Sequence, residues 1–219
     1  MIEAVVFDLD GVLVDSEPVW EQVRRELVAE RGGHWARDAQ RRLMGMSTPE
    51  WAAYLSRDLG VGLPPGQVAT LVIDRMAARY AERVPLMAGA ADAVRRIGGR
   101  WPLGVASSSP PRLIEAVLRS AGLSSCFSAA MSTEQVARGK PAPDIYLAVA
   151  AALGFPPGDC AAVEDSANGL RSAAAAGLRV IAFPQSRYPP APDALARASL
   201  VLPGLAGLTV DAVAALATS

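Results

Sequence analysis

Two aspartates near the start of the chain are the residues best placed to do chemistry. Asp8 and Asp10 follow the apolar run Val5–Phe7, and Gly11 comes directly after them. The run predicts a strand that is buried on both faces of a parallel sheet, and the glycine indicates that the strand breaks there. Two carboxylates at the end of a buried strand repel each other and need a cation, and Mg²⁺ prefers oxygen ligands. We therefore expect a magnesium site at this point.

Other polar side chains stand at comparable places further along the chain. Ser107 ends an apolar run at 102–106, and Glu164 and Asp165 end another at 160–163. Lys140 lies in a Gly- and Pro-rich loop, 139–144, before a predicted helix. Because the carboxyl ends of parallel strands meet at one edge of a sheet, we expect these side chains to converge on the two aspartates.

The elements that position these residues alternate between strand and helix from residue 85 onward. Such alternation is typical of right-handed parallel crossovers, and it predicts an α/β fold with a doubly wound parallel sheet. A Pro-rich surface loop is expected at 184–192. The expected strands are 102–106, 127–131, 160–163, 179–183 and 199–202, and the expected helices are 90–97, 111–121, 144–153 (capped by Asp144), 170–176 and 210–216.

The segment between the first strand and residue 84 has helical periodicity only. Ser16 is expected to cap a first helix that ends at Gly32, and further helices are expected at 36–43, from Thr48 to 59, and at 68–80. An all-helical insertion in an α/β pattern predicts a separate small domain, residues 16–83, and a core made of residues 1–15 and 84–219. The alternative is a set of extra helices packed on one common core.

Composition excludes several classes of function. The 219 residues are 51% hydrophobic and 20% charged, and the net charge is −1, so we expect neither a nucleic-acid nor a membrane partner. Asp8 and Asp10 interrupt the first apolar run, so no signal peptide is expected, and no apolar run is long enough to span a bilayer. Two cysteines, Cys126 and Cys160, give no disulfide framework and favour a cytoplasmic location.

The segment from Asp8 to Ser16, Asp-Leu-Asp-Gly-Val-Leu-Val-Asp-Ser, resembles the first motif of the haloacid dehalogenase (HAD) superfamily. The similarity is greatest to its branch of sugar-phosphate phosphatases and β-phosphoglucomutases. It implies a Rossmann-like core with an inserted α-helical cap domain. It also implies that Asp8 is the nucleophile and a metal ligand, that Asp10 is the general acid/base and binds the metal through its carbonyl, and that Gly11 helps to bind phosphate.

The remaining motifs of this superfamily occur in the same order, and together they span Asp8 to Gly177. The resemblance implies that the Ser107 hydroxyl and the Ser108 amide hold a phosphoryl oxygen. It implies that Lys140, in Gly-Lys-Pro-Ala-Pro-Asp, offsets repulsion between nucleophile and phosphate. Asp165 and its companion Glu164 would complete the Mg²⁺ site, with water in the remaining positions.

The chain departs from the β-phosphoglucomutases in the predicted cap. The His, Arg and Lys that those mutases use fall on Trp20, Thr48 and Met76 here, and His34, the only histidine, is expected at the surface. True dehalogenases are disfavoured because they lack the second aspartate, which Asp10 supplies. We therefore predict a Mg²⁺-dependent phosphatase of a small phosphorylated metabolite, most simply a sugar phosphate. A phosphosugar mutase and a non-catalytic phosphosugar-binding protein remain as alternatives. Candidate substrate-selecting residues are Trp20, Met44, Met46, Thr48, Trp51 and Arg75.

Overall fold

The chain folds into two units, one of which is assembled from both ends of the sequence. The computed structural model describes residues 1–43, 46–185 and 189–218. Met1–Asp15 and Val84–Ser219 form one unit, here called the core unit, and Ser16–Arg83 forms the other, here called the helical unit. Each unit is described separately below.

A six-stranded parallel sheet forms the centre of the core unit, in the order β3-β2-β1-β4-β5-β6. The strands are β1 (Ala4–Phe7), β2 (Leu103–Ser107), β3 (Ala129–Ser132), β4 (Cys160–Glu164), β5 (Arg179–Ala182) and β6 (Leu200–Val201). This arrangement confirms the predicted α/β fold class. The order reverses at β1, with β2 on one side and β4 on the other, and such a reversal opens a crevice at the carboxyl ends of the strands.

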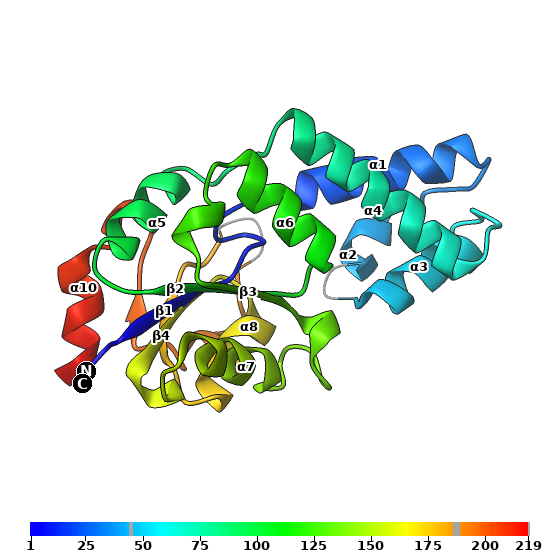
Figure 1. Cartoon of the computed structure of the whole chain (residues 1–219). Helices are drawn as coiled ribbons and strands as arrows, with labels where there is room; N and C mark the ends of the chain where they lie inside the picture. Colours follow the sequence, from blue (N-terminus) through cyan, green and yellow to red (C-terminus); the bar gives the residue numbers. More distant parts are fainter. Residues whose placement is uncertain (44–45, 186–188, 219) are drawn as a thin grey trace. The chain divides into compact units, whose positions relative to one another are not determined.

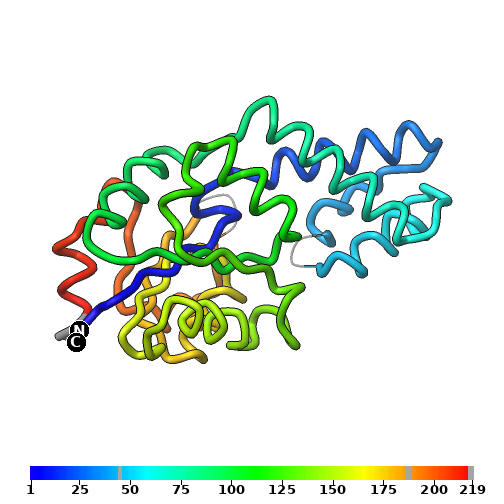
Figure 2. The backbone as a smooth tube through the Cα atoms, viewed as in Figure 1, coloured from blue at the N-terminus to red at the C-terminus, as the bar shows by residue number. Residues whose placement is uncertain are grey.

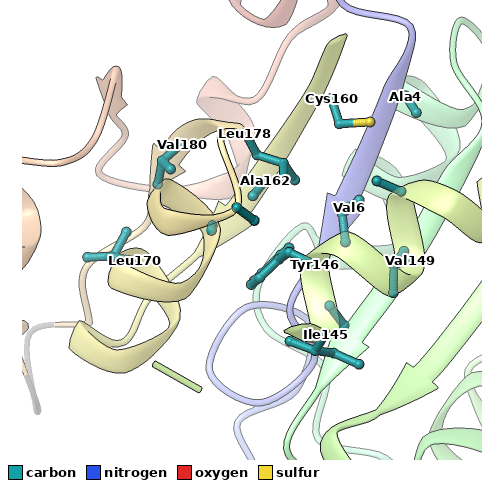
Figure 3. Packing of buried hydrophobic residues seen from close by; sticks show 14 of the residues in the cluster. Ala4, Val6, Ile145, Tyr146, Val149, Cys160, Ala162, Leu170, Leu178 and Val180 are labelled. Carbon is teal, nitrogen blue, oxygen red and sulfur yellow. The ribbon is translucent and has the colours of Figure 1, made fainter. Parts of the chain in front are cut away.

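Helices cover both faces of this sheet (Figure 1). On one face lie α5 (Ala90–Gly98) and α6 (Pro111–Ser120), and on the other lie α7 (Asp144–Leu153) and α8 (Ala167–Ala175). The tube in Figure 2 follows the same crossovers from strand to strand. The face under α7 and α8 is packed with small and branched side chains such as Val6, Val149 and Ala162, all fully buried (Figure 3). The core unit also contains α9 (Pro192–Leu195) and α10 (Val210–Ala214).

The helical unit consists of α1 (Glu17–Glu30), α2 (Ala39–Leu43), α3 (Thr48–Arg57) and α4 (Pro65–Glu82). The long helix α4 packs against both α1 and α3. Its buried residues, among them Val72 and Met76, recur at helical spacing and meet the buried faces of the other two helices. Met76 is therefore a packing residue of this unit.

Several local expectations differ from the structure. Ser16 makes no capping hydrogen bond, because its backbone is already helical (φ −83°, ψ −28°). Pro143, rather than Asp144, occupies the N-cap of α7, and Asp144 pairs with Arg138 at 2.9 Å. The second helix begins at Ala39 and is shorter than expected, and the Pro-rich stretch leads into α9, which was not expected. His34 is exposed, as predicted.

Within residues 1–43, 46–185 and 189–218, no helix has the length and apolar character needed to cross a membrane.

Candidate active site

The turn that follows β1 places Asp8 at the reversal point of the sheet. Phe7 pairs with Val105 of β2 and with Val163 of β4, so the next residue emerges between these two strands. The Asp8 amide donates to the Val163 carbonyl at 2.9 Å, and the Asp8 side chain is almost completely buried. Gly11 then turns the chain with φ +82°, a conformation that favours glycine.

Lys140 is held between Asp8 and Glu164. Its Nζ atom donates to Asp8 Oδ1 at 2.7 Å, to Glu164 Oε1 at 2.6 Å and to the Ala106 carbonyl at 3.0 Å. These contacts use all three N–H groups of the ammonium. The Lys140 side chain is only 6% exposed, so this ion pair lies in a poorly solvated environment.

Glu164 is the most heavily hydrogen-bonded carboxylate of the site. Besides Lys140, its Oε1 atom accepts from the Tyr146 hydroxyl at 2.7 Å. Its Oε2 atom accepts from the Asp165 and Ser166 amides at 3.1 and 3.3 Å and from the Ser166 hydroxyl at 3.2 Å. A Cβ atom on Gly169 would lie 1.8–2.0 Å from the carboxylate, so only glycine leaves room for Glu164 here.

Asp10 lies on the other side of the turn, against the serines that end β2. Its Oδ2 atom accepts from the Ser109 hydroxyl at 2.8 Å and from the Ser107 hydroxyl at 3.2 Å. The amide that reaches the Ser107 hydroxyl belongs to Ser109, at 3.0 Å. Ser108, which the sequence placed in the phosphate-binding group, is exposed. The structure thus adds Ser109 to the residues at this edge.

The charges of this cluster shift one another's pKa values. Burial, reinforced by the neighbouring Glu164, raises the pKa of Asp8 to about 8, although Lys140 opposes the shift. Burial and the Asp8 charge likewise hold the pKa of Asp165 well above its usual range. Burial alone would lower the pKa of Lys140, but the Asp8 and Glu164 carboxylates outweigh it and raise that pKa. The cluster therefore has more carboxyl groups than its one ammonium can balance, and an added cation would favour the ionised form of these carboxyls.

The described residues meet the requirements of a hard divalent cation. Asp8, Glu164 and Asp165 each offer one carboxylate oxygen, and these atoms lie within 4.8 Å of one another. The Oδ1 atom of Asp165 is buried and has no hydrogen-bond partner among the described residues. A Cβ atom on Gly11 would lie 2.0 Å from Asp165 Oδ2, so glycine also keeps this carboxylate in place. An oxygen-rich, negatively charged cluster with an unpaired carboxylate oxygen fits Mg²⁺.

The substrate-selecting residues predicted in the helical unit differ in their exposure and in their contacts. Trp20 and Trp51 are buried and contact each other, with ring centroids 5.9 Å apart, and the buried Arg24 guanidinium lies 4.5 and 5.1 Å from their rings. Arg75 forms a two-pronged ion pair with Glu30 at 2.6 and 3.0 Å. Met46 and Thr48 are half-buried, and Met44 lies outside the described residues.

Three residues of the site were missed by sequence reasoning: Tyr146, Ser109 and Gly169. Tyr146 was the residue that the sequence could most easily have indicated, because a tyrosine on the apolar side of a helix must find a hydrogen-bond partner for its hydroxyl when it is buried. Ser109 could not be told apart from its neighbours in a run of three serines.

Comparisons with known proteins agree with the fold and the motifs. A model of the haloacid dehalogenase-like hydrolases matches residues 2–177. Hexitol phosphatase B of Escherichia coli (strain K12) is 35% identical over 189 residues, which cover 84% of each chain. Fructose-1-phosphate phosphatase YqaB of the same strain is 31% identical over 180 residues, 81% of this chain and 94% of that one. The crystal structure of CbbY from Rhodobacter sphaeroides in complex with phosphate superposes with a TM-score of 0.83 at 32% identity, covering 95% of this chain and 96% of that one.

The fold and the site place this chain among α/β proteins with an acidic cluster at the reversal point of a parallel sheet. The chain belongs to the haloacid dehalogenase-like hydrolases. The resemblance inferred from the motifs is thereby confirmed, and so is the prediction of an enzyme of the phosphatase type.

Proposed function

We propose that the chain is a Mg²⁺-dependent phosphatase of phosphorylated carbohydrates, which acts through a phosphorylated Asp8. The observation that carries this proposal is the position of Asp8, buried at the reversal point of the sheet with the Lys140 ammonium 2.7 Å from its Oδ1 atom. A neighbouring positive charge shifts a buried carboxylate toward its ionised form and lowers its repulsion for an incoming phosphate. The names of the relatives, hexitol phosphatase and fructose-1-phosphate phosphatase, support a carbohydrate phosphate as substrate.

Asp8, Asp165 and the backbone carbonyl of Asp10 would hold the Mg²⁺ ion. When bound, the ion supplies positive charge that screens the phosphoryl oxygens from the carboxylates. The raised pKa of Asp8 supports this role of a cation, because the ionised form that attacks phosphorus is not the favoured form of Asp8 near neutral pH without one. Glu164 already receives five hydrogen bonds from protein groups, which favours a role in holding Lys140.

The reaction would proceed in two displacements at phosphorus. In the first, the Asp8 carboxylate forms a bond to phosphorus as the bond to the sugar oxygen breaks, and Asp10 gives its proton to that oxygen. In the second, Asp10 takes a proton from a water molecule, whose oxygen attacks phosphorus and releases inorganic phosphate from Asp8. Asp10 is suited to both steps, because Ser107 and Ser109 both hold its Oδ2 atom and leave Oδ1 for the reacting oxygens.

The helical unit would serve as the cap that selects the substrate and limits the access of water. Met46 and Thr48 remain candidates for contact with the sugar, since both are partly exposed. Trp20 and Trp51 are buried, so they would influence substrate selection indirectly, by packing with Arg24 and supporting the exposed residues around them. Arg75 is the weakest candidate because Glu30 already pairs with its guanidinium.

The test is phosphate release from a panel of sugar and sugar-alcohol phosphates in the presence of Mg²⁺, by the wild type and by Asp8→Asn. The amide matches the carboxylate in shape but does not attack phosphorus, so the variant should fold normally and lose more than about a thousandfold in kcat. Residual activity within tenfold of the wild type would remove Asp8 as the nucleophile. Wild-type protein that releases phosphate from none of the panel would overturn the proposed function.

A further inference from the structure

Tyr146 is buried on α7 and reaches the charged cluster with its hydroxyl alone. Its side chain is fully buried and packs in the hydrophobic cluster under α7 and α8, as Figure 3 shows. The hydroxyl donates to Glu164 Oε1 at 2.7 Å, and the ring lies 5.2 Å from Lys140 Nζ. Tyrosine hydroxyl and lysine ammonium therefore share one carboxylate oxygen.

Lys140 depends on its contacts for its position. A lysine side chain has a flexible four-carbon stem, and here it extends from a loop rather than from a helix or strand. Of its three acceptors, Asp8 would lose the negative charge of its carboxylate once it is bonded to phosphorus. The other charged acceptor, Glu164, takes no part in bond making, so it is the acceptor that can hold the ammonium in place throughout the reaction.

Glu164 in turn is fixed on both of its oxygens. The turn at Asp165 and Ser166 holds Oε2, and Gly169 leaves room for the carboxylate on one side. Apart from Lys140 itself, Tyr146 is the group that the structure shows donating to Oε1. Without the tyrosine hydroxyl, Oε1 would keep only the lysine as a restraint, and both long side chains could shift together.

We propose that Tyr146 is a positioning residue for Lys140, acting through Glu164. This inference rests on the proposed function, because it assigns Tyr146 to the phosphoryl-transfer site of that reaction. The competing explanation is that Tyr146 fills the core and that its hydroxyl found an acceptor merely because it is buried. Tyr146→Phe separates the two, since the variant keeps the ring and removes only the hydroxyl.

The kinetic test compares Tyr146→Phe with Tyr80→Phe, a matched change at a buried tyrosine of the helical unit. Loss of an orienting partner costs about 10–100-fold in activity, so kcat of Tyr146→Phe should fall by that factor while Tyr80→Phe stays within about twofold of the wild type. Because Tyr146 acts through Glu164, adding Tyr146→Phe to Glu164→Ala, which removes the acceptor, should cause little further loss. A kcat of Tyr146→Phe within twofold of the wild type, or independent losses in the double variant, would overturn the proposal.

A second measurement does not depend on turnover. Lys140 is the only lysine in the sequence, so ¹⁵N-lysine labelling gives one side-chain ammonium signal and no overlap. In the wild type its protons should exchange slowly with water, and in folded Tyr146→Phe they should exchange about tenfold faster or more. An unchanged ammonium signal and exchange rate in Tyr146→Phe would overturn the positioning role even if the proposed substrates were wrong. An inactive wild type with the expected change in exchange would instead overturn the function alone.

Discussion

Gly169→Ala should damage the site through a single added methyl group. In the wild type, a Cβ atom at this position would lie 1.8–2.0 Å from the Glu164 carboxylate atoms, whereas ordinary contacts begin at 3.4 Å. The carboxylate would have to retreat by roughly 1.5 Å, because the new methyl group is fixed to the helix backbone. Such a shift takes Glu164 Oε1 out of hydrogen-bond range of Lys140 and Tyr146, now at 2.6 and 2.7 Å.

Gly169→Ala should lower both the free energy of unfolding and kcat/KM. Replacing a helical glycine by alanine normally stabilises a protein by about 0.5–1 kcal/mol. Two hydrogen bonds to a charged carboxylate contribute about 1.5–3 kcal/mol each, part of which is regained as Glu164 finds other donors. We expect a net loss of about 1–3 kcal/mol in the free energy of unfolding. Misplacing Lys140 by about 1 Å should lower kcat/KM by on the order of 100-fold.

Gly66→Ala is the matched control. Gly66 is also helical, near the start of α4, but a Cβ atom there would meet nothing within 4 Å. This variant should be as stable as the wild type or slightly more so, with unchanged kcat/KM, when both variants are compared by thermal unfolding and phosphate release. If Gly169→Ala behaved like Gly66→Ala in both assays, the packing of Gly169 against Glu164 would not constrain the site.

Three further outcomes concern protons, metal and the phosphoryl acceptor. In metal-free folded protein, burial raises the pKa of Asp8 from 3.8 to about 8, so between these pH values the folded state holds one more proton than the unfolded state. The unfolding temperature should therefore fall as the pH rises from 5 to 8. This dependence on pH should be weaker in Asp8→Asn. The rise in unfolding temperature on adding Mg²⁺ should accordingly be larger at pH 8 than at pH 6, and an equal rise at both would contradict the linkage. A chelator should stop turnover and Ca²⁺ should not restore it, because the larger ion does not impose tight octahedral geometry; full activity in excess chelator would count against a metal requirement. With β-glucose 1-phosphate and a trace of the bisphosphate, free phosphate should appear faster than glucose 6-phosphate, since Trp20, Thr48 and Met76 lack the charge to anchor a second phosphate, and the reverse order would favour a mutase.

The ends of β1, β2 and β4 could be predicted from the sequence because each follows a short apolar run and carries a polar residue. That pattern predicted the parallel sheet and the meeting of Asp8, Asp10, Ser107 and Asp165 at one edge, since strand direction decides which ends meet. Lys140 lies in a loop, and its place at the same edge was predicted from its motif. The sheet order was beyond the sequence, because several right-handed windings satisfy the same alternation of elements.

The partners of individual side chains could not be predicted, because they depend on distances between elements far apart in sequence. Arg75 was proposed as a substrate contact, yet Glu30, 45 positions earlier, takes its guanidinium. Glu164 was expected as a companion metal ligand; it does lie in the acidic cluster, but its protein donors, one of them the Tyr146 hydroxyl, could not be read from the sequence. A motif thus identifies an acidic residue such as Glu164, but it does not identify the groups that will donate hydrogen bonds to its carboxylate.

The single buried lysine also decides how this protein responds to amine-directed reagents. All other basic side chains are arginines, apart from the exposed His34, and arginine does not react with acylating reagents under mild conditions. The Lys140 ammonium is 6% exposed, its pKa is raised by Asp8 and Glu164 despite burial, and all its protons are engaged. Acylation should therefore stop at the α-amino group while the site is intact. A second adduct in the mass spectrum would then report opening of the contacts among Asp8, Lys140 and Glu164, because the sequence contains no other lysine to be acylated.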